Sequence, residues 1–174
     1  NFCSYCIVPY VRGRERSRTP EDIIAEVRKL AADGVKEVML LGQNVNSYGK
    51  NLDNPISFAE LLRMVNEVEG IERIRFSSIE PNVVTEEFAQ ALTELPKVCD
   101  HFHLSLQSGC DATLKRMNRH YTADDYRTIV KNLRDAFENA AITTDIMVGF
   151  AGETEEEFAA SLAFAEEIAF AKVH

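Results

Sequence analysis

Short apolar segments and amphipathic segments alternate along this chain from about residue 20 onward. The apolar segments are nearly continuous hydrophobic runs, such as 35–41 (VKEVMLL), which is typical of strands buried in a parallel sheet. The amphipathic segments carry apolar residues at helical spacing. In the segment beginning at residue 20, Ile23, Ile24 and Val27 share one face. The pattern therefore predicts a series of alternating helices and strands.

Polar residues before each amphipathic segment indicate where the helices begin. A Ser or Thr stands at each expected start, with acidic residues in the turn that follows most of them. The expected caps are Thr19, Ser57, Thr85, Thr122 and Thr154. Gly34 and Gly70 mark the ends of the first two helices.

The expected strands cover residues 35–41, 71–77, 101–107 and 141–150, and a further strand begins near residue 171. Their starts are about 30 to 40 residues apart, which is the repeat of a strand–helix unit in a parallel sheet. The fold class is therefore α/β, and we expect a partial parallel (β/α) barrel that is truncated at both ends. No linker or low-complexity stretch divides the chain, so we expect one domain over residues 1–174.

Polar and glycine residues follow each expected strand. In parallel barrels the active site forms where the carboxyl ends of the strands meet. The amino ends of the same strands look less polar, at Val35, Ile71, His101 and Ala141. Polarity at one rim predicts a ligand site there. The rim residues are Gly42, Gln43 and Asn44, then Ser77, Ser78 and Glu80, then Ser105, Gln107, Ser108 and Gly109, and finally Thr144, Asp145, Gly149 and Gly152.

Two features of these strands suggest specific chemistry. Asp145 lies within an apolar strand, so we expect a buried carboxylate that is held for a ligand or, alternatively, tied to a backbone donor. His101 and His103 alternate along another strand, and such a pair could bind a metal. We favour hydrogen-bonding histidines over metal ligands at these two positions.

The charge balance is acidic, with 28 Asp and Glu against 19 Lys and Arg. This balance argues against broad nonspecific binding of nucleic acid by this segment alone. A local cationic patch survives it, because Arg12, Arg14, Arg16 and Arg18 face only Glu15 in the same stretch. No apolar run approaches the length of a membrane span and no secretory signal is visible, so we expect a cytoplasmic protein without a membrane partner.

Four cysteines in a chain of this size do not suggest a disulfide scaffold, and we expect a reducing compartment. Cys3 and Cys6 have a spacing that suits a zinc site, a redox pair or an iron–sulfur loop. Zinc needs about four ligands, but Cys99 and Cys110 flank a strand and lie roughly 20 Å apart. We therefore expect Cys99 to be a buried structural thiol. A redox pair should open a helix, whereas an iron–sulfur cluster needs at least three thiolates, of which two are visible.

The segment 1–18 (NFCSYCIVPYVRGRERSR) resembles the cluster loop of the radical S-adenosylmethionine (SAM) enzymes, in the branch of tRNA and ribosomal-protein methylthiotransferases. That loop reads Cys-x3-Cys-x2-Cys. Cys3 and Cys6 match its second and third cysteines, and the first would fall two positions before Asn1. The similarity continues through LLGQNVNSYG (40–49), SSIEP (77–81), HLSLQSGCDATLKRMNRHYT (103–122) and TTDIMVGFAGETEEEF (143–158). Ala151 departs from the family, which usually has proline there.

The resemblance implies a radical SAM core domain that binds a [4Fe–4S] cluster through Cys3, Cys6 and the cysteine upstream. The open iron of that cluster would bind SAM, and reduction would give a 5′-deoxyadenosyl radical. Tyr5 corresponds to an aromatic residue near the adenine of SAM. By their positions at the rim, the other expected SAM-binding residues are Gln43, Ser77, Ser78, Gln107, Asp145, Gly149 and Gly152.

The resemblance also implies partners. The substrate would be an adenosine at position 37 in the anticodon stem-loop of a tRNA, and Arg12, Arg14, Arg16 and Arg18 could grip its phosphates or a substrate carboxylate. A solvated loop with an ion pair through Glu15 is the alternative for these arginines. The family's full proteins add an N-terminal domain with a second [4Fe–4S] cluster and a C-terminal RNA-binding domain. A one-electron reductant such as a flavodoxin or ferredoxin would be needed, and we expect a monomer.

The expected activity is C2 methylthiolation of N6-threonylcarbamoyladenosine in tRNA, which SSIEP and the 103–122 block favour. The alternatives are the same reaction on N6-isopentenyladenosine, which GQNVNSYG favours, and methylthiolation of a ribosomal-protein aspartate. A hypothesis of a different class is a non-catalytic barrel that uses its cysteine pair as a zinc staple and binds RNA.

Overall fold

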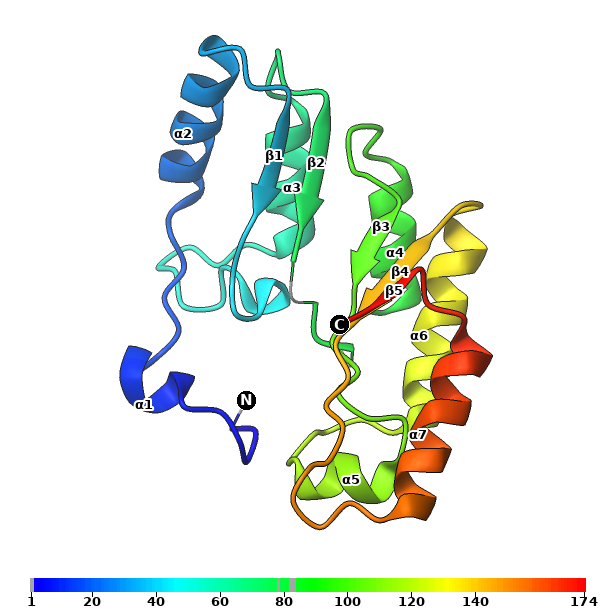
Figure 1. Ribbon diagram of the computed structural model, residues 1–174. Helices are drawn as coiled ribbons and strands as arrows, with labels where there is room; N and C mark the ends of the chain where they lie inside the picture. The colour runs from blue at the N-terminus through cyan, green and yellow to red at the C-terminus, as the bar shows by residue number, and fades with distance from the viewer. Residues whose placement is uncertain (1, 78, 82–83) are drawn as a thin grey trace.

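The computed structural model describes residues 2–77, 79–81 and 84–174. In this part of the chain, helices alternate with short strands, as Figure 1 shows. The strands are β1 (Glu37–Leu40), β2 (Arg73–Phe76), β3 (His101–His103), β4 (Ala141–Thr144) and β5 (Lys172–Val173). The α-helices are α1 (Val8–Arg12), α2 (Pro20–Ala32), α3 (Phe58–Asn66), α4 (Glu86–Thr93), α5 (Asp111–Arg116), α6 (Ala123–Ala136) and α7 (Glu155–Ile168), and η1 (Val45–Ser47) is a 3-10 helix.

All the paired strands are parallel. β1 pairs with β2, and β4 lies between β3 and β5. Two isolated bridges, Ile74 to Val98 and Ile79 to Leu104, connect these two groups into one curved layer. The expected α/β class and the partial parallel barrel are confirmed.

The strands all point toward the same end of the molecule, which is the lower end in Figure 1. Helices α2, α3, α4, α6 and α7 cover one side of the strand layer, and the N-terminal loop, α1 and α5 lie at the end to which the strands point. The cysteine pair therefore lies at the rim where a parallel barrel builds its active site.

The helix starts follow the predicted caps. Each of the five expected residues accepts a hydrogen bond from the backbone N–H three positions later, and three of them form complete capping boxes. The complete boxes pair Ser57 with Glu60, Thr122 with Asp125 and Thr154 with Glu157. Local hydrogen bonding thus sets where these helices begin.

An aromatic row joins the two groups of strands from inside. Phe58 of α3 packs edge-on against Phe76 of β2, with ring centroids 5.3 Å apart. Phe76 in turn lies 6.3 Å from Phe102 of β3, and Phe102 lies 5.1 Å from Phe137. Phe76 and Phe102 are fully buried, so this row holds the layer together where few backbone bonds cross from β2 to β3.

Strands β3 and β4 are shorter than the sequence pattern predicts. The hydroxyl of Thr144 donates to the carbonyl of Leu104 at 2.6 Å and accepts from the N–H of Leu106 at 2.9 Å, so a side chain replaces the backbone ladder. Gln107 then adopts a φ of 69°, outside the strand region. The regular ladder is therefore interrupted after β3 and β4, and pairing resumes only at a single bridge between Gln107 and Ile146, close to the rim.

Two short helices were not expected. α1 has five residues, too few for a helical period to show in the sequence, and none of them is buried. α5 follows Gly109 directly, and its N-cap residue Cys110 makes no side-chain cap bond. Gly109 lies so close to α7 that a Cβ in its place would come within 2.5 Å of Phe164. This close approach explains a glycine that pattern analysis treats as a strand breaker.

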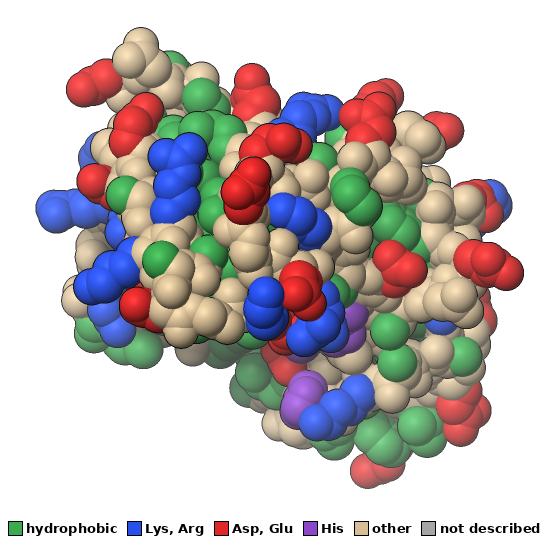
Figure 2. All heavy atoms as spheres, turned by 90° about the horizontal axis from the view of Figure 1, so that it is seen from above, with side chains coloured by type: hydrophobic (Ala, Val, Ile, Leu, Met, Phe, Trp, Pro, Cys, Tyr) green, Lys and Arg blue, Asp and Glu red, His purple; other side chains and the backbone are tan. Residues whose placement is uncertain are grey.

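The face at the amino ends of the strands is more polar than the sequence indicates. Figure 2 looks onto this end and shows basic and acidic side chains intermixed around a histidine. A cavity of about 490 Å³ here is lined by residues that include Arg73, Arg75, Cys99 and His101. Both arginines bond to Glu37, at 2.6 and 3.1 Å, so their charges are paired within the protein. We therefore do not assign a ligand to this cavity, and Cys99 is half-buried at its wall rather than fully buried.

Every helix in the described ranges is too short or too polar to cross a lipid bilayer.

Candidate functional site

The cysteine pair lies in a tight turn just before α1. The N–H of Cys6 donates to the carbonyl of Cys3 at 3.0 Å, and both thiols are partly exposed. Among the described residues, no group of three or more His, Cys, Asp or Glu side chains gathers as a complete metal site would. The turn thus offers two soft sulfur donors on one short loop, which suits an iron–sulfur cluster better than a hard cation.

The turn is docked onto a segment more than a hundred residues away in sequence. The N–H of Ser4 donates to the carbonyl of Met117 at 3.0 Å, and its hydroxyl donates to the carbonyl of Arg116 at 2.9 Å. The side-chain amide of Asn118 donates to the carbonyl of Phe2 at 2.7 Å. Residues 116–118, at the end of α5, therefore hold the cysteine turn on both sides of Cys3.

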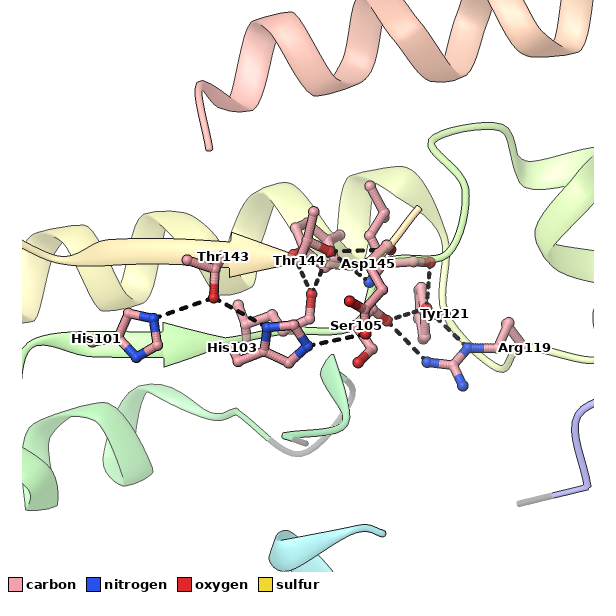
Figure 3. A network of polar contacts seen from close by, with 11 residues as sticks. His101, His103, Ser105, Arg119, Tyr121, Thr143, Thr144 and Asp145 are labelled. Atoms are coloured by element: carbon pink, nitrogen blue, oxygen red, sulfur yellow. Dashed lines mark hydrogen bonds and ion pairs between the residues drawn. The ribbon is translucent and has the colours of Figure 1, made fainter. Parts of the chain in front are cut away.

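Arg119 continues this docking segment and reaches the thiol itself. One guanidinium nitrogen lies 3.3 Å from Cys3 Sγ, and the other terminal nitrogen donates to the carbonyl of Ser105 at 3.0 Å. Its Nε donates to the hydroxyl of Tyr121 at 2.9 Å, and this phenol also lies 2.7 Å from the carbonyl of Leu106. Figure 3 shows Arg119 and Tyr121 converging on Ser105. Burial raises the pKa of Tyr121 above its ordinary value, so the phenol remains a donor.

A second polar network runs along β3 and β4 and ends next to this site (Figure 3). Asp145 Oδ2 lies 3.1 Å from His103 Nε2, and His103 Nδ1 lies 3.1 Å from the hydroxyl of Thr143. That hydroxyl is 3.3 Å from Nε2 of His101. His101, Thr143 and His103 thus form one hydrogen-bonded row that ends at Asp145. Both histidines therefore make hydrogen bonds along the strands, as we expected from the sequence.

Asp145 itself differs from its predicted setting. Its side chain is 44% exposed, whereas the apolar surroundings in the sequence suggested a buried carboxylate. β4 ends at Thr144, so Asp145 already lies beyond the ladder and projects at the rim. The carboxylate therefore keeps access to a ligand while His103 fixes its orientation.

His101 at the far end of the row makes a pH dependence predictable. Its Nδ1 is buried and has no hydrogen-bond partner among the described residues. Burial lowers the pKa of His101 below its ordinary value of 6.5, and Arg75 and His103 lower it further. The unfolded chain therefore takes up this proton first as the pH falls. The contribution of neutral His101 to the free energy of unfolding is complete above about pH 6.5. It is lost as the pH falls from there toward the folded-state pKa.

We expect the free energy of unfolding to fall between pH 7 and 5.5 more steeply in the wild-type protein than in His101→Gln. The difference in slope is at most about 1.4 kcal/mol per pH unit, because one proton is involved. Urea unfolding at several pH values measures it. Equal slopes in the wild-type and His101→Gln proteins would show that His101 does not titrate differently on unfolding.

Tyr5 lies between the two cysteines, as the sequence requires, and the residue is 38% exposed. It packs edge-on against Phe150, in the loop after β4, with ring centroids 6.0 Å apart. Burial raises the pKa of Tyr5 to about 12, against the opposing effect of Arg119. The contact brings the cysteine turn and the loop of Gly149 and Gly152 to the same part of the rim.

The other residues predicted to bind SAM are distributed over the carboxyl ends of the strands. Gln43 is exposed after β1, and Ser77 is half-buried after β2, where its N–H donates to the carbonyl of Leu40 at 3.2 Å. Ser78 lies outside the described residues. Gln107 is held beside Asp145, because its N–H donates to that residue's carbonyl at 2.8 Å. The structure therefore joins Gln107 and Asp145 directly, and it leaves Gln43 and Ser77 on neighbouring strands.

Gly149 and Gly152 both have positive φ values, 73° and 80°, which favour glycine in the loop after β4. A Cβ at Gly149 would meet no atom within 4 Å, and one at Gly152 would lie 3.8 Å from Arg116. Backbone conformation rather than protein packing therefore explains these glycines, and space remains beside Gly149 for a ligand.

A polar cluster near the end of β2 gathers Asn44 and Glu80, two of the expected rim residues without an assigned role, together with Asn46. Glu80 and Asn46 are both buried, and the N–H of Glu80 donates to the side-chain oxygen of Asn46 at 3.1 Å. The amide nitrogen of Asn44 lies 3.4 Å from a carboxylate oxygen of Glu80. Asn44 Oδ1 is a buried acceptor without a partner in the described part of the chain. Their positions directly after β1 and β2 were the available signal.

The predicted arginine patch divides into two parts. Arg18 pairs with Glu26 of α2 at 2.5 Å, so its charge is already engaged. Arg12, Arg14 and Arg16 are exposed, and none of the ion pairs found among the described residues includes them. The expected alternative, an ion pair through Glu15, is not among those pairs either. Three of the four arginines thus remain available to a partner.

Hydrogen bonds between side chains and the backbone fix the arginine segment on the rim. The N–H of Gly49 donates to the hydroxyl of Ser17 at 2.9 Å, and the phenol of Tyr48 donates to the carbonyl of Arg18 at 2.9 Å. The loop after β1 therefore holds the segment that carries the arginines.

Comparisons with known proteins agree with this geometry. The family described as "Radical SAM superfamily" matches residues 1–165. A protein of Caldicellulosiruptor saccharolyticus named tRNA-2-methylthio-N(6)-dimethylallyladenosine synthase is 58% identical over 170 residues, which is 98% of this chain and 36% of that protein. A protein of the same name from Clostridium novyi is 56% identical over 98% of this chain and 38% of its own length. The chain thus spans just over a third of the curated relatives it matches.

Two solved structures share the fold. A radical S-adenosylmethionine methyltransferase, TsrM, from Kitasatospora setae superposes with a TM-score of 0.77 at 19% identity, over 98% of this chain and 33% of that one. Methylornithine synthase (PylB) superposes with a TM-score of 0.66 at 20% identity, over 98% of this chain and 48% of that one.

Proposed function

Because the chain belongs to the radical SAM superfamily, we propose that it is the core of an enzyme that adds a methylthio group to C2 of N6-dimethylallyladenosine in tRNA. The observation that carries this proposal is the high identity, over nearly the whole chain, to proteins named as synthases of that nucleoside. Cys3 and Cys6, on the rim at the carboxyl ends of the strands, support a [4Fe–4S] cluster there. A third thiolate is expected upstream of Asn1.

The rim suits SAM as well as the cluster. When bound, the cluster and SAM supply a 5′-deoxyadenosyl radical. SAM carries an amino group and ribose hydroxyls. The rim offers acceptors for such donors in Asp145 and in Asn44 Oδ1, which has no hydrogen-bond partner within the described ranges. Gln107 is fixed beside Asp145, and Gly149 leaves room for close approach. The protein's part is to bind and orient these groups and to exclude water around the reacting carbon.

The substrate substituent is the point on which the sequence expectation changes. The sequence blocks favoured N6-threonylcarbamoyladenosine, but the relatives are named for the dimethylallyl compound, which was the alternative. Leu41 and Val148, which follow β1 and β4, are 75% and 65% exposed and could receive an apolar group. A ribosomal-protein aspartate has no support from these names. The zinc-stapled barrel is set aside, because the family match covers residues 1–165.

The test uses the full-length protein, reconstituted anaerobically with iron and sulfide and supplied with SAM and a reductant. Three anticodon stem-loops are compared, which carry N6-dimethylallyladenosine, N6-threonylcarbamoyladenosine or plain adenosine at position 37. Mass spectrometry of the nucleosides should find the methylthio product only from the first. A product from the second alone would restore the threonylcarbamoyl assignment.

We also propose that Arg12, Arg14 and Arg16 contact tRNA phosphates, although most of the RNA affinity would come from domains outside this chain. Arg14→Gln with Arg16→Gln should weaken tRNA binding and reduce the slope of log affinity against log salt by about 0.7 to 0.9 per lost phosphate contact. Filter binding at several salt concentrations measures this slope. Arg28→Gln with Lys29→Gln removes the same charge from the exposed side of α2 and should leave the slope unchanged. Equal slopes in both double variants would argue against phosphate contact by the arginine segment.

A further inference from the structure

Within the residues that the structure describes, Arg119 is the one cationic side chain that hydrogen-bonds to a cysteine of the turn. Its guanidinium lies 3.3 Å from Cys3 Sγ, although 116 positions separate the two residues in sequence. The resemblance to a known family assigned no role to Arg119, and the proposed function does not use it.

The guanidinium is held from two other directions. Its Nε donates to Tyr121 Oη at 2.9 Å, and Nη2 donates to the carbonyl of Ser105 at 3.0 Å. The ring of Tyr121, which is only 5% exposed, also lies against the guanidinium carbon at 5.0 Å. A planar group with two fixed bonds keeps its remaining N–H donors pointed at the sulfur.

The charge of Arg119 is not cancelled by these partners. A phenol, a backbone carbonyl and a thiol sulfur receive its three hydrogen bonds, and none of these is a carboxylate. Arg116, three positions earlier, illustrates the contrast, because it is paired with Glu157. Arg119 therefore presents a net positive charge to Cys3.

We propose that Arg119 is a positioning residue that holds Cys3 and raises the reduction potential of the cluster bound by the cysteine turn. The inference rests on the proposed function only in requiring a [4Fe–4S] cluster at Cys3 and Cys6. Reduction adds one negative charge to the cluster. A nearby cation that donates an N–H to a ligand sulfur therefore stabilises the reduced form more than the oxidised form. The docking bonds of Ser4 and Asn118 keep the sulfur within reach of the guanidinium.

The test is an anaerobic redox titration of the reconstituted full-length protein without SAM, followed by electron paramagnetic resonance. Cys3→Ala identifies the reduction step that belongs to this cluster, because that step disappears. Arg119→Met should shift the same step to a lower potential by the equivalent of about tenfold in the reduction equilibrium, or about 59 mV for one electron. Arg119→Lys, which keeps the charge but loses the fork, should shift it less. Lys115→Met removes an exposed cation from α5 and should leave the potential unchanged.

An unchanged or higher potential in Arg119→Met would overturn the proposal. If the unchanged potential is accompanied by weakened SAM binding, Arg119 acts on SAM and not on the cluster. If Arg119→Met binds no iron at this site, Arg119→Gln, which keeps N–H donors but loses the charge, decides: a lower potential supports the proposal and an unchanged one overturns it. Because the titration needs no tRNA, its result is independent of whether the methylthio product forms.

Discussion

Replacing Cys3 or Cys6 by alanine in the full-length protein removes the cluster at the rim of the strand layer. Each variant leaves too few thiolates to hold three irons, so the loss is expected to be complete, at about four irons per protein molecule. Iron and acid-labile sulfide analysis after anaerobic reconstitution measures it. Any cluster in an N-terminal domain should be retained, so the variants keep the remaining iron.

The chain supplies its own controls for this experiment. Cys99 lines the cavity at the opposite end of the strands, and Cys110 caps α5 without a side-chain bond. Cys99→Ala and Cys110→Ala should therefore bind the same iron as the wild-type protein. Full iron content in Cys3→Ala would contradict the assignment of a cluster to the cysteine turn. Zinc instead of iron in the wild-type protein would contradict it too.

Asp145→Ala is expected to weaken SAM binding by about 10- to 100-fold. A carboxylate that accepts a hydrogen bond from a ligand hydroxyl or amino group contributes about 1.5–3 kcal/mol, and each 1.4 kcal/mol is a factor of ten in affinity. His103 holds one carboxylate oxygen at 3.1 Å, which orients the group toward the rim. Equilibrium binding of SAM to the cluster-loaded protein measures the dissociation constant.

Two variants separate ligand binding by Asp145 from a structural role. Asp145→Asn keeps the shape but loses the charge, so its affinity should lie between those of the wild-type protein and Asp145→Ala. Asp135→Ala removes an exposed carboxylate on α6 that pairs with Lys131, and it should not change SAM binding. Unchanged SAM affinity in Asp145→Ala, with a loss of thermal stability instead, would show that Asp145 serves only as the partner of His103.

Features that depend on neighbouring residues were predictable from the sequence. All five helix caps are correct, because a cap is a hydrogen bond between residues three positions apart. The order of helices and parallel strands followed from hydrophobic runs of the right length and spacing. The position of the cysteine turn at the carboxyl ends of the strands followed from that order together with the resemblance.

Features that depend on long-range contacts were not predictable. β3 ends early because the hydroxyl of Thr144, and not a backbone N–H, bonds to the carbonyl of Leu104. These two residues are 40 positions apart in the sequence. The contact of Arg119 with Cys3 likewise depends on the hydrogen bonds that join the end of α5 to the cysteine turn. No periodic pattern marks α5, since it has six residues and the preceding cap makes no side-chain bond. Among the predicted SAM-binding residues that the structure describes, only Gln107 and Asp145 are joined directly, by a backbone hydrogen bond just beyond the ends of β3 and β4.

The central claim is that the strand rim around Cys3 and Cys6 generates a radical from SAM. The most direct test is the formation of 5′-deoxyadenosine by the full-length protein, reconstituted with iron and sulfide under anaerobic conditions and given SAM and a one-electron reductant. The account predicts 5′-deoxyadenosine from the wild-type protein and none from Cys3→Ala or Cys6→Ala. A wild-type protein that carries the full cluster and binds SAM, yet forms no 5′-deoxyadenosine in the presence of its tRNA substrate, would contradict it.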